Sequence, residues 1–201
     1  MSRKYSGLFV VVEGIDGTGK STLVSNIYRA LRKKGIDTML TFEPTHGEWG
    51  MKLRRSFMDS KRAEAEEELS MFMKDRKEHL RDVIIPALQN GRVVLCDRYY
   101  FSTIAYQGAR GLDPEKIQEE NEEFALRPDI CFILELNPEK AVRRITEGRM
   151  DRTNNFEQTD YLKRVAEIFS SLKDECIIRL DAELSPDKLA EKAVEIILDR
   201  L

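Results

Sequence analysis

The sequence predicts an α/β fold of three layers, in which helices cover both faces of a mainly parallel, five-stranded sheet. Five short apolar segments are distributed along the 201 residues, and segments with helical spacing of apolar residues separate them. The first apolar segment runs into a glycine-rich turn, and a helical pattern begins directly after that turn. Strands that alternate with helices are typical of sheets whose strands are joined by crossovers and lie parallel.

The five predicted strands are short and rich in β-branched and other apolar residues, which is typical of strands covered on both faces. Residues 8–12, for example, contain no polar side chain. We place the strands at residues 8–12, 37–42, 93–96, 130–136 and 176–180.

The predicted helices are bounded by residues that favour helix ends. Gly35 is suited to end the first helix, and two serine- or aspartate-proline pairs, beginning at Asp113 and Ser185, are suited to start later ones. We place the helices at residues 22–34, 49–57, 63–90 with a break near Pro86, 99–107, 113–125, 138–146, 156–172 and 185–201.

The composition predicts one domain over residues 1–201 with a substantial core and a well-solvated surface. Hydrophobic residues make up 41% of the chain and charged residues 34%, and the formal net charge is -3. An acidic chain argues against a general nucleic-acid binder, which is usually basic. No apolar run approaches the roughly 20 residues of a membrane span, so we expect no membrane partner. Cys96, Cys131 and Cys176 lack metal-site spacing and are expected to be buried free thiols of a cytoplasmic protein.

The turn after the first strand carries a phosphate-binding pattern. Gly14 and the run Gly19-Lys20-Ser21 fit G-x-x-x-x-G-K-[ST], whose backbone N–H groups surround a polyphosphate. A lysine in this position reaches the β- and γ-phosphates, and the serine hydroxyl binds Mg²⁺. We therefore predict that Lys20 is catalytic and that the ATP site contains Gly14, Asp16, Gly17, Thr18, Gly19, Lys20, Ser21 and Thr22.

A second charged pair follows the third predicted strand. Asp97 and Arg98 come directly after it, at the edge where open parallel sheets bind their ligands. We expect Asp97 to hold Mg²⁺ together with Ser21, although an aspartate here also suits a simple capping role. Arg98 is expected to neutralise charge that develops during phosphoryl transfer. The guanine-reading N-K-x-D motif that a GTPase normally carries does not occur in the sequence.

Several groups of residues, taken together, point to a known family. They are residues 13–22, Phe72-Met73-Lys74-Asp75-Arg76, Asp97-Arg98-Tyr99 with Ser102 and residues 105–108, and residues 127–129 before Pro138-Glu139. With these motifs the chain resembles the thymidylate kinases, nucleoside-monophosphate kinases with a P-loop NTPase fold, over nearly its whole length. The resemblance implies Mg²⁺-dependent transfer of phosphate from ATP to dTMP, which gives dTDP.

The resemblance implies a binding site for the thymine base. Phe72 would stack on the ring, Arg76 would contact the base or the acceptor phosphate, and Thr103 would face the base edge. Alternatively, Phe72 would pack in the core, and Arg76 would be an ordinary exposed surface residue.

The resemblance also implies contacts to the sugar and the acceptor phosphate. Asp16 would bind the 3′-hydroxyl group, Tyr106 would pack beneath the sugar and disfavour a ribose 2′-hydroxyl, and Arg98 would hold the phosphate. The full set of predicted acceptor-binding residues is Asp16, Glu43, Phe72, Arg76, Arg98, Ser102, Thr103, Tyr106 and Gln107.

A short arginine-bearing lid is a further implication of the resemblance. Family members with glycine in place of a basic residue in the phosphate loop carry catalytic arginines in the lid, and this chain has Gly17. The lid is expected at about residues 145–156, with Arg149 and Arg152 as its catalytic residues. Arg144 would stack on the adenine of ATP. Because an arginine also stands directly before it, the match to the family's adenine-stacking position is open by one residue.

Two departures from the family pattern keep other functions open. Many relatives carry Arg-Glu-Pro after the second strand, whereas this chain has Phe42-Glu43-Pro44, and its lid has fewer arginines. A kinase for another deoxynucleotide or deoxynucleoside is therefore an alternative, and an inactive nucleotide-binding regulatory module is another. A DNA-stimulated ATPase is disfavoured by the acidic composition. The resemblance further implies a homodimer that contacts through helices including residues 63–90.

Overall fold

The sheet at the centre of the molecule is parallel throughout. The computed structural model describes residues 5–59, 62–147 and 155–201, and within them five strands form one sheet in the order β2-β3-β1-β4-β5. All neighbouring pairs of strands are parallel, so the predicted fold class is confirmed. The strands are β1 (Leu8–Gly14), β2 (Thr38–Phe42), β3 (Val93–Asp97), β4 (Ile130–Glu135) and β5 (Ile177–Asp181).

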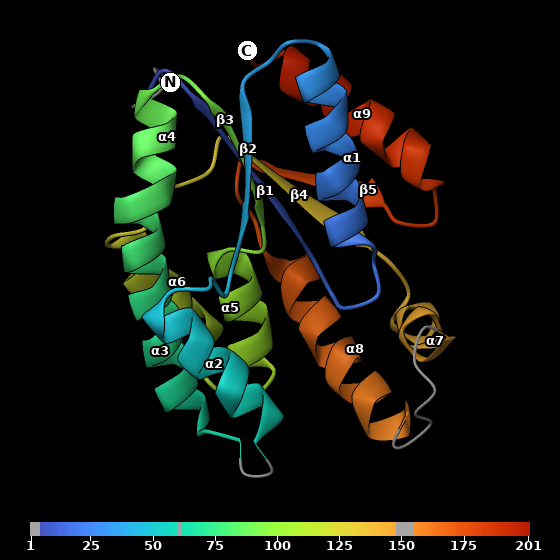
Figure 1. Cartoon of the computed structure of the whole chain (residues 1–201). Helices are drawn as coiled ribbons and strands as arrows, with labels where there is room; N and C mark the ends of the chain where they lie inside the picture. The colour runs from blue at the N-terminus through green and yellow to red at the C-terminus, as the bar shows by residue number, and fades with distance from the viewer. Residues whose placement is uncertain (1–4, 60–61, 148–154) are drawn as a thin grey trace.

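Helices cover both faces of this sheet and complete the three predicted layers (Figure 1). α1 (Lys20–Lys33) and α9 (Pro186–Leu198) pack together on one face, and α4 (Ile85–Gln89) and α5 (Tyr100–Gly108) contact the sheet from the other. α8 (Asn155–Ser171) packs against α5. The other α-helices of the described ranges are α2 (Glu48–Met58), α3 (Ala65–His79), α6 (Pro114–Glu122) and α7 (Pro138–Glu147).

The long helix predicted at residues 63–90 forms as one continuous rod, but it is not α-helical throughout. α3 passes into a π-helical turn, η1 (Leu80–Ile84), before α4 begins. Pro86 has no N–H group, and its ring would crowd a carbonyl group in the preceding turn of an α-helix. The wider π-helical turn directly upstream accommodates the proline, which explains why the predicted break does not occur.

The core lies on both sides of the central strands. Every residue of β1 is buried, whereas Leu40 in the edge strand β2 is 41% exposed. The three cysteines are buried and free, as predicted. Within the described ranges, no helix has both the length and the apolar character that crossing a membrane requires.

The order of the strands places the functional motifs next to one another. β1 lies between β3 and β4, and the chain leaves its carboxyl end through the glycine-rich loop toward α1. Asp97, the last residue of β3, pairs with Val12 of β1. The turn after β3 therefore lies beside the loop after β1, at the edge where open parallel sheets bind ligands.

Candidate active site

A cleft of about 810 Å³ opens at the carboxyl edge of the sheet. The loop between β1 and α1 forms one wall, and the ends of β2 and β3 with parts of α2 and α7 form the rest. Charged groups predicted from separate motifs thus share one cavity. The predicted nucleotide-binding, catalytic and metal-binding residues that line it are Asp16, Gly17, Gly19, Lys20, Ser21, Thr22, Asp97, Arg98 and Arg144.

Glycines give the phosphate loop its shape. Gly14, Gly17 and Gly19 have φ angles of 134°, 84° and 92°, which L side chains rarely adopt. Gly14 lies behind the cleft lining, where a Cβ atom would meet the carbonyl oxygen of Leu134 at 2.6 Å. A Cβ atom at Gly17 would lie 2.5 Å from the carbonyl oxygen of Ala141 in α7. The glycine from which the lid arginines were predicted is therefore also required by the packing of α7.

The ammonium group of Lys20 is buried under the loop. Its Nζ donates a hydrogen bond to the carbonyl oxygen of Ile15 at 2.9 Å and lies 4.0 Å from Asp16 Oδ1. Thr18 Oγ1 donates to the same carbonyl oxygen at 2.8 Å, so this residue braces the loop and does not line the cleft. Burial, and then the positive charge of Arg98, lower the pKa of Lys20 to about 8. A bound polyphosphate would favour the charged form of this lysine.

Ser21 and Asp97 form a candidate metal site. Ser21 Oγ donates to Asp97 Oδ2 at 2.5 Å, although the two residues come from α1 and β3. Asp97 Oδ1 is buried and has no hydrogen-bond partner among the described residues. Mg²⁺ takes oxygen ligands and is usually bound by one or two carboxylates together with substrate phosphates. A hydroxyl group and an unpaired carboxylate oxygen beside a phosphate loop fit this ion.

Arg98 has an unusual backbone conformation. Its φ of 69° lies in the left-handed region, which few residues other than glycine adopt. The guanidinium group donates to Asp16 Oδ1 at 2.5 Å and to Ser102 Oγ at 3.0 Å. It also lies 5.0 Å from the centroid of the Tyr106 ring. These contacts hold a cation in the cleft wall, next to the phosphate loop.

A second cavity of about 340 Å³ adjoins the cleft. The residues that line both cavities are Asp16, Glu43, Pro44 and Arg98. All of the predicted acceptor-binding residues line the smaller cavity, although they come from separate segments of the chain. They are Asp16, Glu43, Phe72, Arg76, Arg98, Ser102, Thr103, Tyr106 and Gln107.

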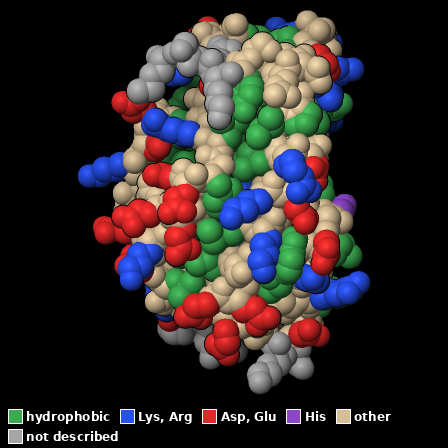
Figure 2. Space-filling model, turned by 90° about the vertical axis from the view of Figure 1, so that its left-hand side faces the viewer, with side chains coloured by type: hydrophobic (Ala, Val, Ile, Leu, Met, Phe, Trp, Pro, Cys, Tyr) green, Lys and Arg blue, Asp and Glu red, His purple; other side chains and the backbone are tan. Residues whose placement is uncertain are grey.

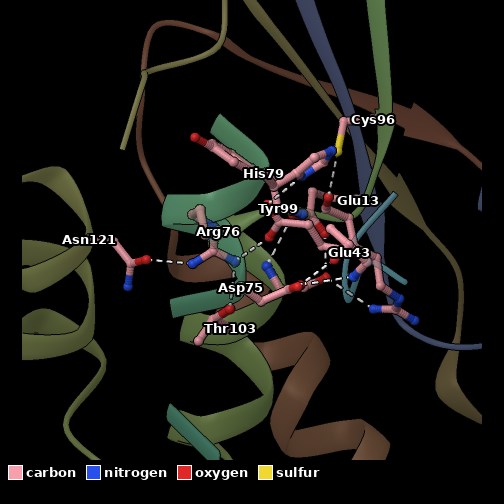
Figure 3. Close-up of polar contacts among 12 residues, drawn as sticks. Glu13, Glu43, Asp75, Arg76, His79, Cys96, Tyr99, Thr103 and Asn121 are labelled. Carbon is pink, nitrogen blue, oxygen red and sulfur yellow. Dashed lines mark hydrogen bonds and ion pairs between the residues drawn. The ribbon is translucent and has the colours of Figure 1, made fainter. Parts of the chain in front are cut away.

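Arg76 is fully buried in the wall of the smaller cavity (Figure 3). Its guanidinium group donates to Glu43 Oε2 at 2.6 Å, to Asn121 Oδ1 at 2.5 Å and to Thr103 Oγ1 at 3.0 Å. His79 Nδ1 lies 3.0 Å from the other carboxylate oxygen of Glu43. The Nε atom of Arg76 has no hydrogen-bond partner in the described part of the chain. The exposed surface position, the alternative for this arginine, is thus excluded.

A buried carboxylate behind the smaller cavity was not found by sequence reasoning. Glu68 in α3 is 0% exposed, pairs with Arg62 at 2.6 Å and Arg110 at 2.5 Å, and accepts from Gln107 Nε2 at 3.1 Å. It therefore orients two side chains that line the cavity. The available signal was its position four residues before Phe72, which places both residues on one helix face.

Glu13 is a second functional candidate that sequence reasoning missed. It is 0% exposed near the end of β1, and it accepts hydrogen bonds from the backbone N–H groups of Tyr99 and Ser102 at 2.8 and 3.1 Å. Burial raises the pKa of Glu13 to about 7, against these hydrogen bonds and the charge of Arg98. The available signal was an acidic residue directly after an apolar strand.

The departure from the family pattern at position 42 has a structural consequence. Phe42 lines the cleft, and the guanidinium group of Arg54 in α2 lies 5.5 Å from its ring centroid. The same guanidinium group donates to the carbonyl oxygen of Pro44 at 2.5 Å, and the ring of His46 contacts Phe42 at 5.0 Å. The arginine that many relatives carry at position 42 is absent from this chain, but α2 contributes Arg54 to the cleft. Sequence spacing gave no signal for this contact.

The predicted lid lies mostly outside the described residues. Arg149 and Arg152 belong to residues 148–154, which the structure does not describe. Arg144, near the end of α7, lines the cleft and donates to the carbonyl oxygen of Ala182 at 3.1 Å. Because Arg144 lines the cleft, the adenine contact to be tested is the one predicted for Arg144 and not for the neighbouring arginine.

Comparison with known proteins identifies the family. A family model described as thymidylate kinase matches residues 12–193. The thymidylate kinase of Desulfotalea psychrophila is 43% identical over 183 residues, which cover 91% of this chain and 90% of that protein. The thymidylate kinase of Brachyspira hyodysenteriae is 44% identical over 193 residues, 95% and 93% of the two chains. A probable thymidylate kinase of Archaeoglobus fulgidus is 39% identical over 190 residues, 94% of each chain. The resemblance predicted from the motifs is therefore confirmed, and the chain belongs to the thymidylate kinase family.

Proposed function

We propose that this chain transfers the γ-phosphoryl group of ATP to dTMP, which yields ADP and dTDP. The observation that carries the proposal is the meeting of the two cavities at Asp16, Glu43, Pro44 and Arg98. A triphosphate in the larger cleft and a monophosphate in the smaller cavity would bring their reacting phosphates together beside Arg98. Holding two reactants in this way supplies a large part of the rate enhancement in phosphoryl transfer.

On the donor side, the loop surrounds the polyphosphate and Lys20 neutralises its charge. The N–H groups of the loop and the start of α1 favour an anion, because they are not used within the helix and lie at its positive end. Arg144 is proposed to stack on the adenine ring. Its hydrogen bond to the carbonyl oxygen of Ala182 would hold the guanidinium plane in place.

Ser21 and Asp97 are proposed to hold Mg²⁺ on the donor phosphates. The unpaired Oδ1 atom of Asp97 supports this assignment. Bound there, the ion would neutralise charge on the phosphate oxygens. The contribution of the two side chains is to fix the position of the polyphosphate relative to Arg98.

On the acceptor side, the smaller cavity fits a nucleoside monophosphate. Phe72 lies 6.2 Å from Phe57, ring centroid to ring centroid, and its face is proposed to stack on thymine. The unpaired Nε atom of Arg76 supplies a buried donor for a base oxygen. Asp16 is proposed to accept from the 3′-hydroxyl group, and Tyr106 to exclude a 2′-hydroxyl group.

Little covalent chemistry is required of the protein. An acceptor phosphate oxygen is already anionic, so the nucleophile needs no side-chain base. Arg98 holds that phosphate and stabilises the charge that develops on the transferring group. We also propose that residues 145–156 form a lid of one kinase domain, with Arg149 and Arg152 as further cations, and that closure excludes water.

The proposal is tested by an acceptor panel. Purified protein with ATP and Mg²⁺ is offered dTMP, dUMP, dCMP, dGMP and thymidine, and ADP release is measured. Preference for dTMP is expected. Stronger turnover with dCMP, dGMP or thymidine would overturn the assigned acceptor, and nucleotide binding without transfer to any acceptor would indicate a regulatory module.

We also propose that the chain forms a homodimer and works in the cytoplasm. Figure 2 shows apolar side chains between charged ones on the face formed by α3, η1 and α4. Val83 of η1 is 37% exposed, and its replacement by glutamate should shift the mass measured by light scattering from dimer to monomer. The free thiols of all three cysteines support a reducing compartment.

A further inference from the structure

Glu13 connects the strand that leads into the phosphate loop with the turn that carries Arg98. Its Oε1 atom accepts from the backbone N–H groups of Tyr99 and Ser102 at 2.8 and 3.1 Å. Its Oε2 atom accepts from the hydroxyl group of Ser102. Figure 3 shows Glu13 within the polar cluster, close to Tyr99. A single buried carboxylate therefore receives three hydrogen bonds from one turn.

These hydrogen bonds satisfy the start of α5. The first N–H groups of a helix have no partner within the helix, and a side chain of the preceding residue usually supplies one. Tyr99 stands in that position in α5 and makes no side-chain cap. Glu13, more than 80 residues away in sequence, supplies the cap from the neighbouring strand, although the N–H group of Ser102 also donates to the carbonyl oxygen of Tyr99 at 3.1 Å. In its ionised form, its negative charge also suits the positive end of the helix.

The same contacts fix the backbone of Arg98 on both sides. The N–H group of Arg98 donates to the carbonyl oxygen of Val12 at 3.0 Å, and the next N–H group, that of Tyr99, donates to Glu13. Between these two anchors Arg98 adopts its φ of 69°, a conformation that costs about 1–2 kcal/mol in an L residue. The carbonyl oxygen of Arg98 also accepts from Cys96 Sγ at 3.1 Å, so loss of the second anchor would weaken the restraint on this turn without removing it.

Ser102 carries the effect of Glu13 to the guanidinium group. Its hydroxyl group donates to Glu13 Oε2, so its lone pairs are left to accept from Arg98 Nη1 at 3.0 Å. The direction of this hydroxyl group is therefore set by the carboxylate. Arg98 then points toward Asp16 in the space that the two cavities share.

We propose that Glu13 is a positioning residue for phosphoryl transfer, which holds Arg98 in the left-handed turn and aims its guanidinium group at the acceptor phosphate. Because Glu13 directly precedes Gly14, one residue sets the relative position of the donor loop and the acceptor arginine. This inference rests on the proposed function. The inference goes beyond the proposed function because it assigns a role to a carboxylate that lines neither cavity.

The test compares Glu13→Gln with Asp129→Asn. Glutamine keeps the size of the side chain and an oxygen for the two backbone N–H groups, but it removes the charge and places an N–H₂ group against the Ser102 hydroxyl group, which must then accept where it had donated. Asp129 Oδ2 accepts from the N–H group of Phe9 at 2.7 Å, near the opposite end of β1, so Asp129→Asn also replaces a carboxylate that accepts from a backbone N–H group of this strand by a weaker amide acceptor. Both variants should lose thermal stability. Only E13Q should lose kcat/KM for dTMP, by about 10- to 100-fold, while its Kd for ATP changes less than about threefold.

Two further variants keep the test decisive if E13Q folds poorly. Ser102→Ala removes the hydroxyl relay and leaves the backbone hydrogen bonds, and it should lower kcat/KM for dTMP by about tenfold. Glu13→Asp retains the charge but reaches less far, and should fall between E13Q and the parent. Loss of kcat/KM in E13Q that equals the loss in D129N, or equal losses for ATP and dTMP, would overturn the proposal.

The outcome for Glu13 is separable from that for the proposed function. If the parent protein prefers another acceptor, the same comparison is made with that acceptor, and the selective loss of kcat/KM for it is still expected. If the parent transfers phosphate to no acceptor, the proposed function fails. The role of Glu13 is then read from crystal structures of E13Q and the parent, in which Arg98 should leave or keep its positive φ, respectively.

Discussion

Arg98 Nη2 lies 2.5 Å from Asp16 Oδ1, and this hydrogen bond spans the boundary between the two cavities. Asp16 belongs to the loop after β1, whereas Arg98 belongs to the turn after β3. Their side chains are 54% and 21% exposed, so an acceptor molecule can reach both. The pair connects the group proposed to bind the acceptor sugar with the group proposed to bind its phosphate.

Asp16→Asn should weaken recognition of the 3′-hydroxyl group. The amide keeps its size but accepts hydrogen bonds less strongly than a carboxylate, and it weakens the pairing with Arg98. We expect KM for dTMP to rise about tenfold, with a smaller effect on KM for ATP. Steady-state kinetics with dTMP and with 3′-deoxy-dTMP check this. The preference for dTMP over the 3′-deoxy analogue should shrink in the variant, and an unchanged preference would mean that Asp16 acts only on Arg98.

Lys20→Met should abolish turnover and yet stabilise the protein without ligands. Burial of the ammonium group lowers its pKa from 10.5 to about 8, which corresponds to a cost of about 3 kcal/mol at neutral pH. The variant loses the hydrogen bond to Ile15, worth about 1 kcal/mol. A net gain of about 2 kcal/mol in the free energy of unfolding is therefore expected in urea titrations at pH 7. Near-normal ADP release by this variant would overturn the role of the loop.

The lowered pKa of Lys20 also predicts how stability depends on pH. Between about pH 8 and 10.5 the unfolded chain still binds the proton that the folded protein has lost. The contribution of Lys20 to the free energy of unfolding should therefore rise with pH across this window. Urea titrations of the parent and of Lys20→Met should converge as pH rises above 8, and near pH 10.5 the parent should be the more stable of the two by about 1 kcal/mol, the worth of its hydrogen bond to Ile15. A difference that stays constant with pH would show that this lysine keeps its ordinary pKa.

The sequence predicted the sheet and the phosphate loop because these features depend on local patterns, whereas the acceptor-binding set was implied only by the resemblance to the thymidylate kinases. Apolar runs predict buried strands wherever they occur, and motif spacing is preserved in the fold. The contact of Arg54 with Phe42 and the pairing of Glu68 with Arg62 and Arg110 depend on tertiary packing. No periodicity specifies them. The π-helical turn before Pro86 also depends on tertiary packing. The proline indicates that the α-helix is interrupted nearby, but it does not indicate that the interruption is a π-helical turn.

Glu43→Gln should destabilise the fold and weaken acceptor binding together. Glu43 balances the charge of Arg76, which is 0% exposed, and removal of one partner of such a buried pair typically costs about 3–5 kcal/mol. Urea titrations and KM for dTMP measure the two effects. Glu48→Gln is the matched control, because Glu48 pairs with Lys52 on the exposed side of α2 and should leave both quantities nearly unchanged. Equal effects of the two variants would contradict the structural role of the buried pair.

Arg144→Ala should weaken ATP binding without changing dTMP binding. The guanidinium group lines the donor cleft and is held by the carbonyl oxygen of Ala182. A cation–π contact with adenine is worth about 1 kcal/mol, so KM for ATP should rise about fivefold while KM for dTMP stays constant. Arg143→Ala removes the neighbouring arginine, which is exposed like Arg144 but does not line the cleft. If Arg143→Ala raises KM for ATP and Arg144→Ala does not, the adenine contact lies one residue earlier, because successive residues of a helix point about 100° apart and only one of the two can face the ring.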